Sequence, residues 1–140
     1  MKKLVLIGLL VAACASAQTV FYKTSATLEW DAVVLKEGGA PLDPGTVIEY
    51  EVGRSAMPVA DRAMPETPLG TVSATSASVT IPVVATSYAY AVRAKATVDG
   101  GATTLWSAWA WTDVEGYPVP FVYRAPSTMP PRRPQGLRNQ

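Results

Sequence analysis

The side chains of this sequence that could do acid–base chemistry are two pairs of carboxylates. Glu29 and Asp31 form one pair and Glu49 and Glu51 the other, each at spacing i, i+2. Two carboxylates at close range can divide the roles of general acid and general base. In a β-strand, however, residues i and i+2 share one face, and acidic residues on a solvated face keep a sheet protein soluble. We therefore interpret both pairs as surface charge.

The sequence has few other residues that an enzyme would use. It contains no histidine, the commonest general base and metal ligand, and its one cysteine is Cys14. Asp99 precedes two glycines, a pattern typical of a turn rather than of a calcium site. The sequence shows no phosphate-binding loop, metal-ligand cluster or cofactor fingerprint. It therefore predicts a non-enzymatic protein with no catalytic residues, no cofactor and no metal.

Residues 1–17 have the pattern of a secretory signal peptide. Lys2 and Lys3 precede an apolar run over residues 4–13, and the small residues Ala15-Ser16-Ala17 follow it. The apolar run is shorter than the ~20 residues that a membrane-spanning helix needs. The sequence therefore predicts export rather than a membrane span.

A second processing pattern overlaps the first. Val11-Ala12-Ala13-Cys14 resembles the lipobox of bacterial lipoproteins, in which the signal ends before the cysteine and the cysteine is lipidated. Cleavage after Ala17 would release a soluble product. Cleavage after residue 13 would leave a protein tethered to the cell envelope through Cys14. Both patterns are well formed, so a secreted or periplasmic protein and a lipid-anchored one both stay open.

Charge and composition differ along the exported part of the chain. Residues 18–117 carry eleven acidic and six basic side chains, whereas residues 118–140 carry four arginines and no acid. An acidic body argues against nucleic acid as a partner, since nucleic acid binds basic faces. Without cysteine, this part must rely on a hydrophobic core rather than on disulfides. Its abundance of Val, Ala, Thr and Ser favours strands.

Alternating apolar and polar residues predict an all-β domain of about seven antiparallel strands at sandwich-like spacing. Turn-forming residues separate the strands, and the prolines of residues 57–68 exclude a central strand there. No stretch shows a helical period. The strands are expected at residues 20–23, 26–30, 47–54, 69–72, 77–81, 88–98 and 105–114.

Three aromatic residues within these strands resemble the pattern of the fibronectin type III module. Trp30 lies in the second strand within Leu-Glu-Trp-Asp-Ala, Tyr50 in the third within Ile-Glu-Tyr-Glu-Val, and Tyr88 opens the sixth. The resemblance implies an immunoglobulin-like β-sandwich over residues 18–117, with Trp30 and Tyr50 in its core. It also implies that the Tyr88 ring packs inward and that its hydroxyl binds backbone near the preceding loop.

A second resemblance lies in the last predicted strand. Trp-Ser-Ala-Trp-Ala at residues 106–110 is similar to the Trp-Ser-x-Trp-Ser box of cytokine-receptor modules, without the final serine. That likeness implies that Trp106 and Trp109 interleave with Arg93 and Lys95, at ~0.5–1 kcal/mol for each exposed cation–π pair. We interpret the box as reinforcement of the sheet surface. The alternative is that these four side chains form a binding surface for a protein or a glycan.

Residues 118–140 are expected to form a Pro/Arg-rich extended tail. Six prolines within it exclude a central strand and favour extended conformations. Phe121 and Tyr123 are candidates to cover exposed tryptophans. Arg132 and Arg133 are candidates to contact an acidic neighbour, such as the body of another copy. The alternative is a flexible terminus.

These features together predict an exported, non-enzymatic interaction or assembly module. Its partner would be a protein or glycan at the cell surface or in the periplasm, or further copies of itself, with membrane contact only through Cys14. The alternative is a structural subunit of a virion or extracellular assembly, whose tail docks on a neighbouring copy.

Overall fold

The computed structural model describes residues 18–126, 134–136 and 138–139, which are predominantly β. The prediction of a β-rich fold is therefore confirmed. The predicted signal peptide with Cys14, and the tail residues Arg132 and Arg133, lie outside the described residues. No helix in the described part is long and apolar enough to cross a membrane.

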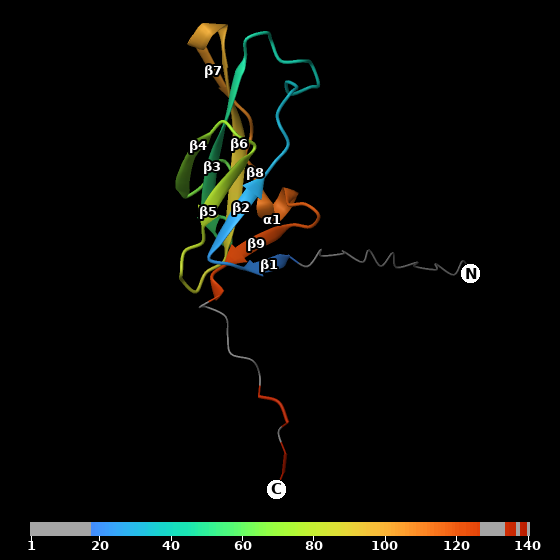
Figure 1. The fold of residues 1–140 in the computed structure, drawn as a ribbon, viewed down its shortest axis with the longest axis vertical. Helices are drawn as coiled ribbons and strands as arrows, with labels where there is room; N and C mark the ends of the chain where they lie inside the picture. The colour runs from blue at the N-terminus through green and yellow to red at the C-terminus, as the bar shows by residue number, and fades with distance from the viewer. Residues whose placement is uncertain (1–17, 127–133, 137, 140) are drawn as a thin grey trace, which may run out of the picture.

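Nine strands follow one another along the described chain, together with one 3-10 turn and one helix of four residues (Figure 1). The elements are β1 (Thr19–Tyr22), β2 (Ser25–Glu29), β3 (Val47–Ala56), β4 (Thr67–Val72), β5 (Ser76–Thr80), β6 (Tyr88–Val98), η1 (Asp99–Gly101), β7 (Thr103–Trp106), β8 (Ala110–Trp111), α1 (Thr112–Glu115) and β9 (Phe121–Arg124).

The strands form two sheets of unequal size. The large sheet has the order β1-β9-β6-β3-β4, and β7 and β8 also pair with β6; the small sheet consists of β2 and β5. The long strands β3 and β6 are antiparallel over ten residue pairs, from Val47 opposite Thr97 to Ala56 opposite Tyr88. β3 alternates apolar and polar residues over Ile48–Val52, whereas β6 is apolar on both faces over Tyr88–Val92 and alternates only from Arg93 on; both strands turn apolar side chains toward the small sheet.

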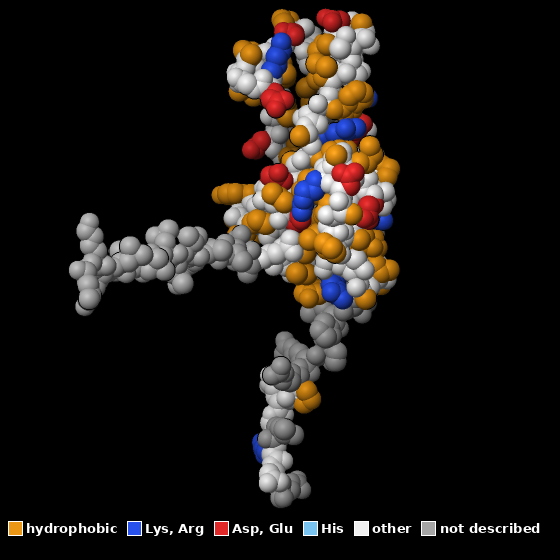
Figure 2. Space-filling model, turned by 180° about the vertical axis from the view of Figure 1, so that it is seen from behind, with side chains coloured by type: hydrophobic (Ala, Val, Ile, Leu, Met, Phe, Trp, Pro, Cys, Tyr) orange, Lys and Arg blue, Asp and Glu red, His pale blue; other side chains and the backbone are white. Residues whose placement is uncertain are grey.

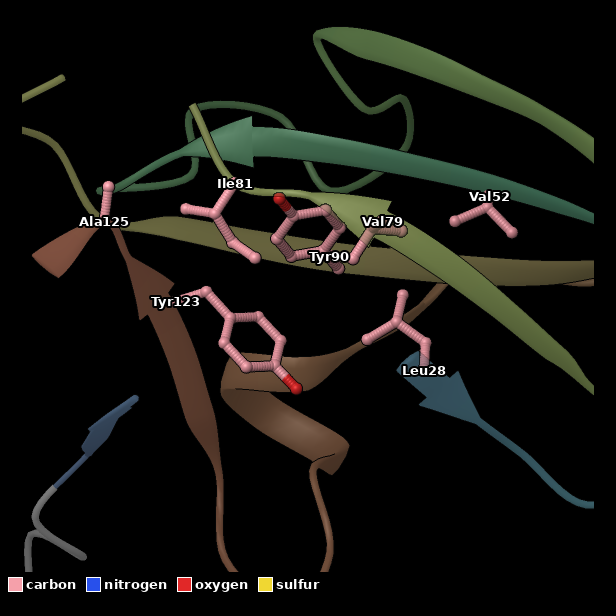
Figure 3. Close-up of a cluster of buried hydrophobic side chains, with 7 residues drawn as sticks. All are labelled: Leu28, Val52, Val79, Ile81, Tyr90, Tyr123 and Ala125. Atoms are coloured by element: carbon pink, nitrogen blue, oxygen red, sulfur yellow. The ribbon is translucent and has the colours of Figure 1, made fainter. Parts of the chain in front are cut away.

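The main core lies between the two sheets (Figure 3). Leu28 and Val79 of the small sheet meet Val52, Tyr90 and Tyr123 of the large one. Burial of apolar surface is the dominant favourable contribution to folding, so this cluster fixes how the layers face each other.

A second cluster lies on the opposite face of β6. Ala89 and Ala91 pack there with Trp111 and Val122, and the loop after β3 contributes Met57 and Val59. The described chain therefore buries apolar side chains on both faces of its central strand.

The loop at residues 57–66 is tied closely to β3. A Cβ added at Gly53 would lie 2.6 Å from side-chain atoms of Pro65, so only glycine permits this approach. The backbone N–H of Glu66 donates to Ser55 Oγ (2.9 Å), and that of Ala56 donates to the Glu66 carboxylate (3.2 Å). The register of β3 against β4 shifts at the same place, between Val52 and Gly53.

The expectation of one strand over residues 105–114 is wrong. Pairing with β6 is interrupted after Trp106 and resumes at Ala110, and the chain then forms α1. At the interruption the Ser107 backbone N–H still donates to the Ala94 carbonyl (2.9 Å), but the Ala94 N–H donates to Ser107 Oγ (2.9 Å) in place of a backbone carbonyl. α1 begins where the Glu115 carboxylate accepts a hydrogen bond from the backbone N–H of Trp111.

The predicted boundary between domain and tail at residue 117 is also wrong. β9 pairs with β1 over four positions, and Tyr123 lies opposite Tyr88 of β6. Prolines 118, 120 and 126 flank β9 rather than interrupt it, which is why a proline-rich segment can supply a strand. The β1–β9 pairing is parallel, so the expectation of antiparallel strands throughout needs correction too.

Candidate functional site

The outer face of the large sheet carries a stack of aromatic and basic side chains, here called the Trp–Arg stack (Trp106, Arg93 and Trp109). The guanidinium of Arg93 lies 5.5 Å from the ring centroid of Trp106 and 4.7 Å from that of Trp109. Both distances fall within cation–π range. The irregular backbone between β7 and β8 lets both indoles reach the same arginine, although strict alternation in one strand would place them on opposite faces.

The charges of the Trp–Arg stack are already paired. The register of β3 and β6 places Glu51 opposite Arg93 and Glu49 opposite Lys95. Arg93 Nε donates a hydrogen bond to the Glu51 carboxylate, and Lys95 Nζ lies 3.5 Å from Glu49 Oε2. Lys95 thus lies beside the stack and pairs with a carboxylate. On the face seen in Figure 2, acidic and basic side chains likewise lie near one another among apolar ones. Trp106 is 52% exposed, so one indole remains open to solvent.

The residues expected in the core by family resemblance occupy different depths. Tyr50 is buried, and its hydroxyl accepts a hydrogen bond from the backbone N–H of Val33 (2.9 Å). Trp30 is half-buried, just beyond the end of β2, and meets the Tyr50 ring edge-on at 5.3 Å. Its indole Nε1 is buried and has no hydrogen-bond partner among the described residues. Trp30 therefore stands at the border of the core.

The hydroxyl that binds backbone before β6 belongs to Tyr90, which corrects the role expected for Tyr88. Tyr90 is fully buried, and its hydroxyl donates to the carbonyl of Thr80 at the end of β5 (3.2 Å). Tyr88 is half-buried and packs on the same core, with the Arg54 guanidinium 5.5 Å from its ring centroid. The two tyrosines share one face of β6, so a sequence pattern with period two cannot separate them.

Phe121 and Tyr123 do not cover the Trp–Arg stack. Both lie in β9, where the Phe121 ring is 5.6 Å from that of Phe21 and the Tyr123 ring is 5.7 Å from that of Tyr90. They pack on the main core between the sheets, because their segment is a strand of the large sheet.

A groove opens where the small sheet ends. It has a volume of about 610 Å³ and lies between β2 and the segment from β8 through α1 to β9. We call it the β2 groove. Its lining residues are Thr27, Leu28, Glu29, Trp30, Asp31, Tyr90, Val92, Ala110, Trp111, Thr112, Glu115, Gly116, Tyr117 and Phe121.

The free edge of β2 forms one side of the β2 groove. The small sheet contains only β2 and β5 among the described residues, because β1 pairs with β9 instead. The Trp30 N–H donates to the Thr75 carbonyl and the Ile81 N–H to the Thr24 carbonyl, so even-numbered β2 residues bond toward β5. Antiparallel ladders alternate, so the backbone N–H and C=O groups of the odd-numbered residues face the open edge. Those residues are Ser25, Thr27 and Glu29.

The β2 groove combines aromatic surface with negative charge. Glu29, Asp31 and Glu115 are exposed carboxylate residues, and no described residue in the lining is Lys or Arg. The aromatic lining ranges from Trp111, 3% exposed, to Tyr117, 91% exposed. Such a surface favours a partner that carries positive charge and rigid apolar groups.

The end of the β2 groove is closely packed. A Cβ added at Gly116 would lie 2.2 Å from the Thr112 carbonyl oxygen and 2.8 Å from the Phe121 ring. Only glycine therefore lets the chain leave α1 and pass beside Phe121.

The loop at residues 57–66 contacts β8 and α1, which line the β2 groove. Arg62 makes two hydrogen bonds to the Asp113 carboxylate of α1, at 2.9 and 2.6 Å. The Asp113 side chain is 2% exposed, and its hydrogen bonds raise the pKa of Arg62 above the usual value. The Trp111 indole N–H donates to the Arg62 carbonyl (3.0 Å). The ion pair thus links the loop after β3 to the helix beside the groove.

Sequence reasoning missed the β2 groove because its lining comes from separate segments. Glu29 and Asp31 were recognised as surface charge, but nothing in their spacing places α1 opposite them. The available signal was Trp30, an aromatic residue between two acids at the end of a strand.

Within the described residues, no group of three His, Cys, Asp or Glu side chains is placed to hold a metal ion. Comparisons with protein-family models, with curated proteins and with solved structures found no match to this chain.

Proposed function

We propose that this chain is an exported, non-enzymatic interaction and assembly module of the fibronectin type III kind. Its two packed layers, with Tyr50 buried and a tyrosine hydroxyl bound to backbone before β6, support that family resemblance. The proposed activity is binding of an extended protein segment that carries positive charge.

The β2 groove carries the proposal. It offers free backbone groups on one side, an aromatic floor, and three carboxylate residues without a basic residue in the described lining. Extended peptides bind such edges through main-chain hydrogen bonds, while pockets for side chains supply specificity. The Trp–Arg stack is less suited to this role, because Glu51 already neutralises Arg93.

The proposal is tested by titrating the purified full chain into two labelled synthetic peptides and following fluorescence anisotropy. One peptide combines arginine with proline, and its matched control has glutamate at every arginine position. We expect the basic peptide to bind and the acidic one not to bind.

Two variants locate the binding. Glu29→Gln combined with Asp31→Asn should abolish binding of the basic peptide, whereas Glu49→Gln, at the edge of the Trp–Arg stack, should leave it unchanged. Equal binding of both peptides, or a loss caused by Glu49→Gln alone, would contradict the proposal.

A further inference from the structure

The C-terminal segment of this chain has the chemistry that the β2 groove favours. Residues 18–126 carry eleven acidic and seven basic side chains, a formal charge of −4, whereas residues 127–140 carry three arginines and no acid. Arg132, Arg133 and Arg138 are those arginines. The body and the segment beyond it are therefore complementary in charge.

Proline in the segment matches the aromatic lining of the β2 groove. The sequence Pro130-Pro131-Arg132-Arg133-Pro134 favours the polyproline II conformation, which aromatic-lined grooves bind at low cost in conformational entropy. Trp30, Tyr117 and Phe121 supply such surfaces.

The segment and the β2 groove also agree in length. Residues 130–138 would span roughly 25 Å in this conformation, at ~3.1 Å per residue. Residues 25–31, along the edge of β2, extend over roughly 20 Å at ~3.3 Å per residue.

The described part of the segment does not occupy the groove of its own chain. Residues 134–136 and 138–139 are exposed and lie away from the body (Figure 1). The chain leaves the large sheet at Ala125, beyond the end of β9 opposite to Phe121, so it runs away from its own groove. The five residue-to-residue steps from Ala125 to Pro130 can bridge roughly 16 Å to a neighbouring molecule.

We propose that residues 130–138 of one copy dock in the β2 groove of a second copy. The arginines meet Glu29 and Asp31, and the prolines lie against Trp30 and Tyr117. The inference rests on the proposed function and names the partner of that same site. The contact joins two different surfaces, so the copies assemble head to tail. An open chain keeps a free groove at one end and a free segment at the other, whereas a closed ring keeps neither.

A charge-swap series measured by sedimentation velocity tests this docking in the full chain. One variant reverses the groove (Glu29→Lys, Asp31→Lys), a second reverses the segment (Arg132→Glu, Arg133→Glu), and a third combines all four substitutions. Glu29 and Asp31 are exposed, and Arg132 and Arg133 follow the last strand in the sequence, so the fold should persist, as circular dichroism checks. Glu115 is left intact because it accepts a hydrogen bond from the Trp111 backbone N–H.

The docking predicts that the natural chain associates as its concentration rises and that higher salt weakens the association. Each reversal alone should weaken self-association by at least about tenfold, because like charges then face each other. The combined variant should recover it. A mixture of the groove variant and the segment variant contains a basic groove and an acidic segment on different molecules. A complex between the two variants should therefore also form.

A monomeric natural chain would overturn the inference, and so would a combined variant that fails to recover. If the natural chain is monomeric but the basic peptide of the previous section binds, docking between copies is wrong and the proposed function stands. Both proposals are wrong if the groove binds no basic peptide and if, in addition, the groove variant and the segment variant each associate as the natural chain does, with the same dependence on salt.

Discussion

The Trp–Arg stack and the β2 groove both present aromatic rings beside charged side chains. They differ in whether a neighbouring strand of the same sheet supplies the opposite charge. In the stack, β3 and β6 are neighbouring strands, and their register supplies Glu51 to Arg93 from within the sheet. In the groove, Glu29 and Asp31 lie at a strand edge that no other described strand covers. A surface whose charges are paired internally reinforces the fold, whereas an unpaired one is available to a partner.

The two regions meet at Trp111, whose loss should have the largest effect. Trp111→Ala should destabilise the fold by about 3–5 kcal/mol, because it leaves a cavity against Ala89 and Ala91 and removes the bond to the Arg62 carbonyl. Trp106→Ala, at a half-exposed position, serves as the control and should cost about 1 kcal/mol. Urea unfolding measures both. A similar decrease in the free energy of unfolding for the two variants would contradict the burial of Trp111.

The Trp–Arg stack should contribute stability rather than binding. Arg93→Met should lower the free energy of unfolding by about 1–3 kcal/mol, since it removes an ion pair and two ring contacts. Lys95→Met is the matched control and should cost less than about 1 kcal/mol, because the Lys95–Glu49 pair is longer and more exposed. Chemical denaturation again gives the values, and an Arg93→Met protein as stable as the natural one would show that the stack reinforces nothing.

High pH should weaken the main core between the two sheets, which contains two buried tyrosines. Burial raises the pKa of Tyr90 and that of Tyr123 above the ordinary value of 10.0. The neutral phenol is therefore favoured in the folded state, and its contribution is fully present below pH 10 and is lost as the pH rises through the folded-state pKa.

Thermal unfolding at a series of pH values should show a melting temperature that falls above about pH 10. Tyr123→Phe removes one of the two groups and should make that fall shallower. An unchanged slope in this variant would contradict the assignment.

The smallest effect on stability is expected in the β2 groove. Glu29→Gln combined with Asp31→Asn should change the free energy of unfolding by less than about 0.5 kcal/mol, because both residues are exposed. The same variant should lose binding of the basic peptide. A marked destabilisation in urea would show that these carboxylates serve the fold instead.

The sequence was most informative where one rule decides the structure. Alternation located β2, β3, β5 and the second half of β6, because a half-buried strand must alternate. It failed where a side chain replaces a backbone acceptor, as Ser107 Oγ does in accepting the hydrogen bond from the Ala94 N–H. It also failed at β9, since prolines at both ends of a short strand resemble those of an unstructured tail.

The β2 groove could not be predicted for a related reason. The edge of β2 is open because β1 pairs with β9 rather than with β2. β1 and β9 are far apart in the sequence, and no local sequence pattern indicates which strands pair. The packing of Phe21 against Phe121 and Tyr123 accompanies the β1–β9 pairing. For the Trp–Arg stack, by contrast, a short motif predicted that Trp106 and Trp109 meet Arg93, but not the irregular backbone that brings both indoles to one face.

The indole N–H signals of the four tryptophans offer the most direct test of which region binds. In a nitrogen–proton correlation spectrum, Trp30 reports on the β2 groove, while Trp106 and Trp109 report on the Trp–Arg stack. Titration of the full chain with the basic peptide should shift the Trp30 signal and leave those of Trp106 and Trp109 in place. Movement of the Trp106 and Trp109 signals with Trp30 unchanged would contradict the account.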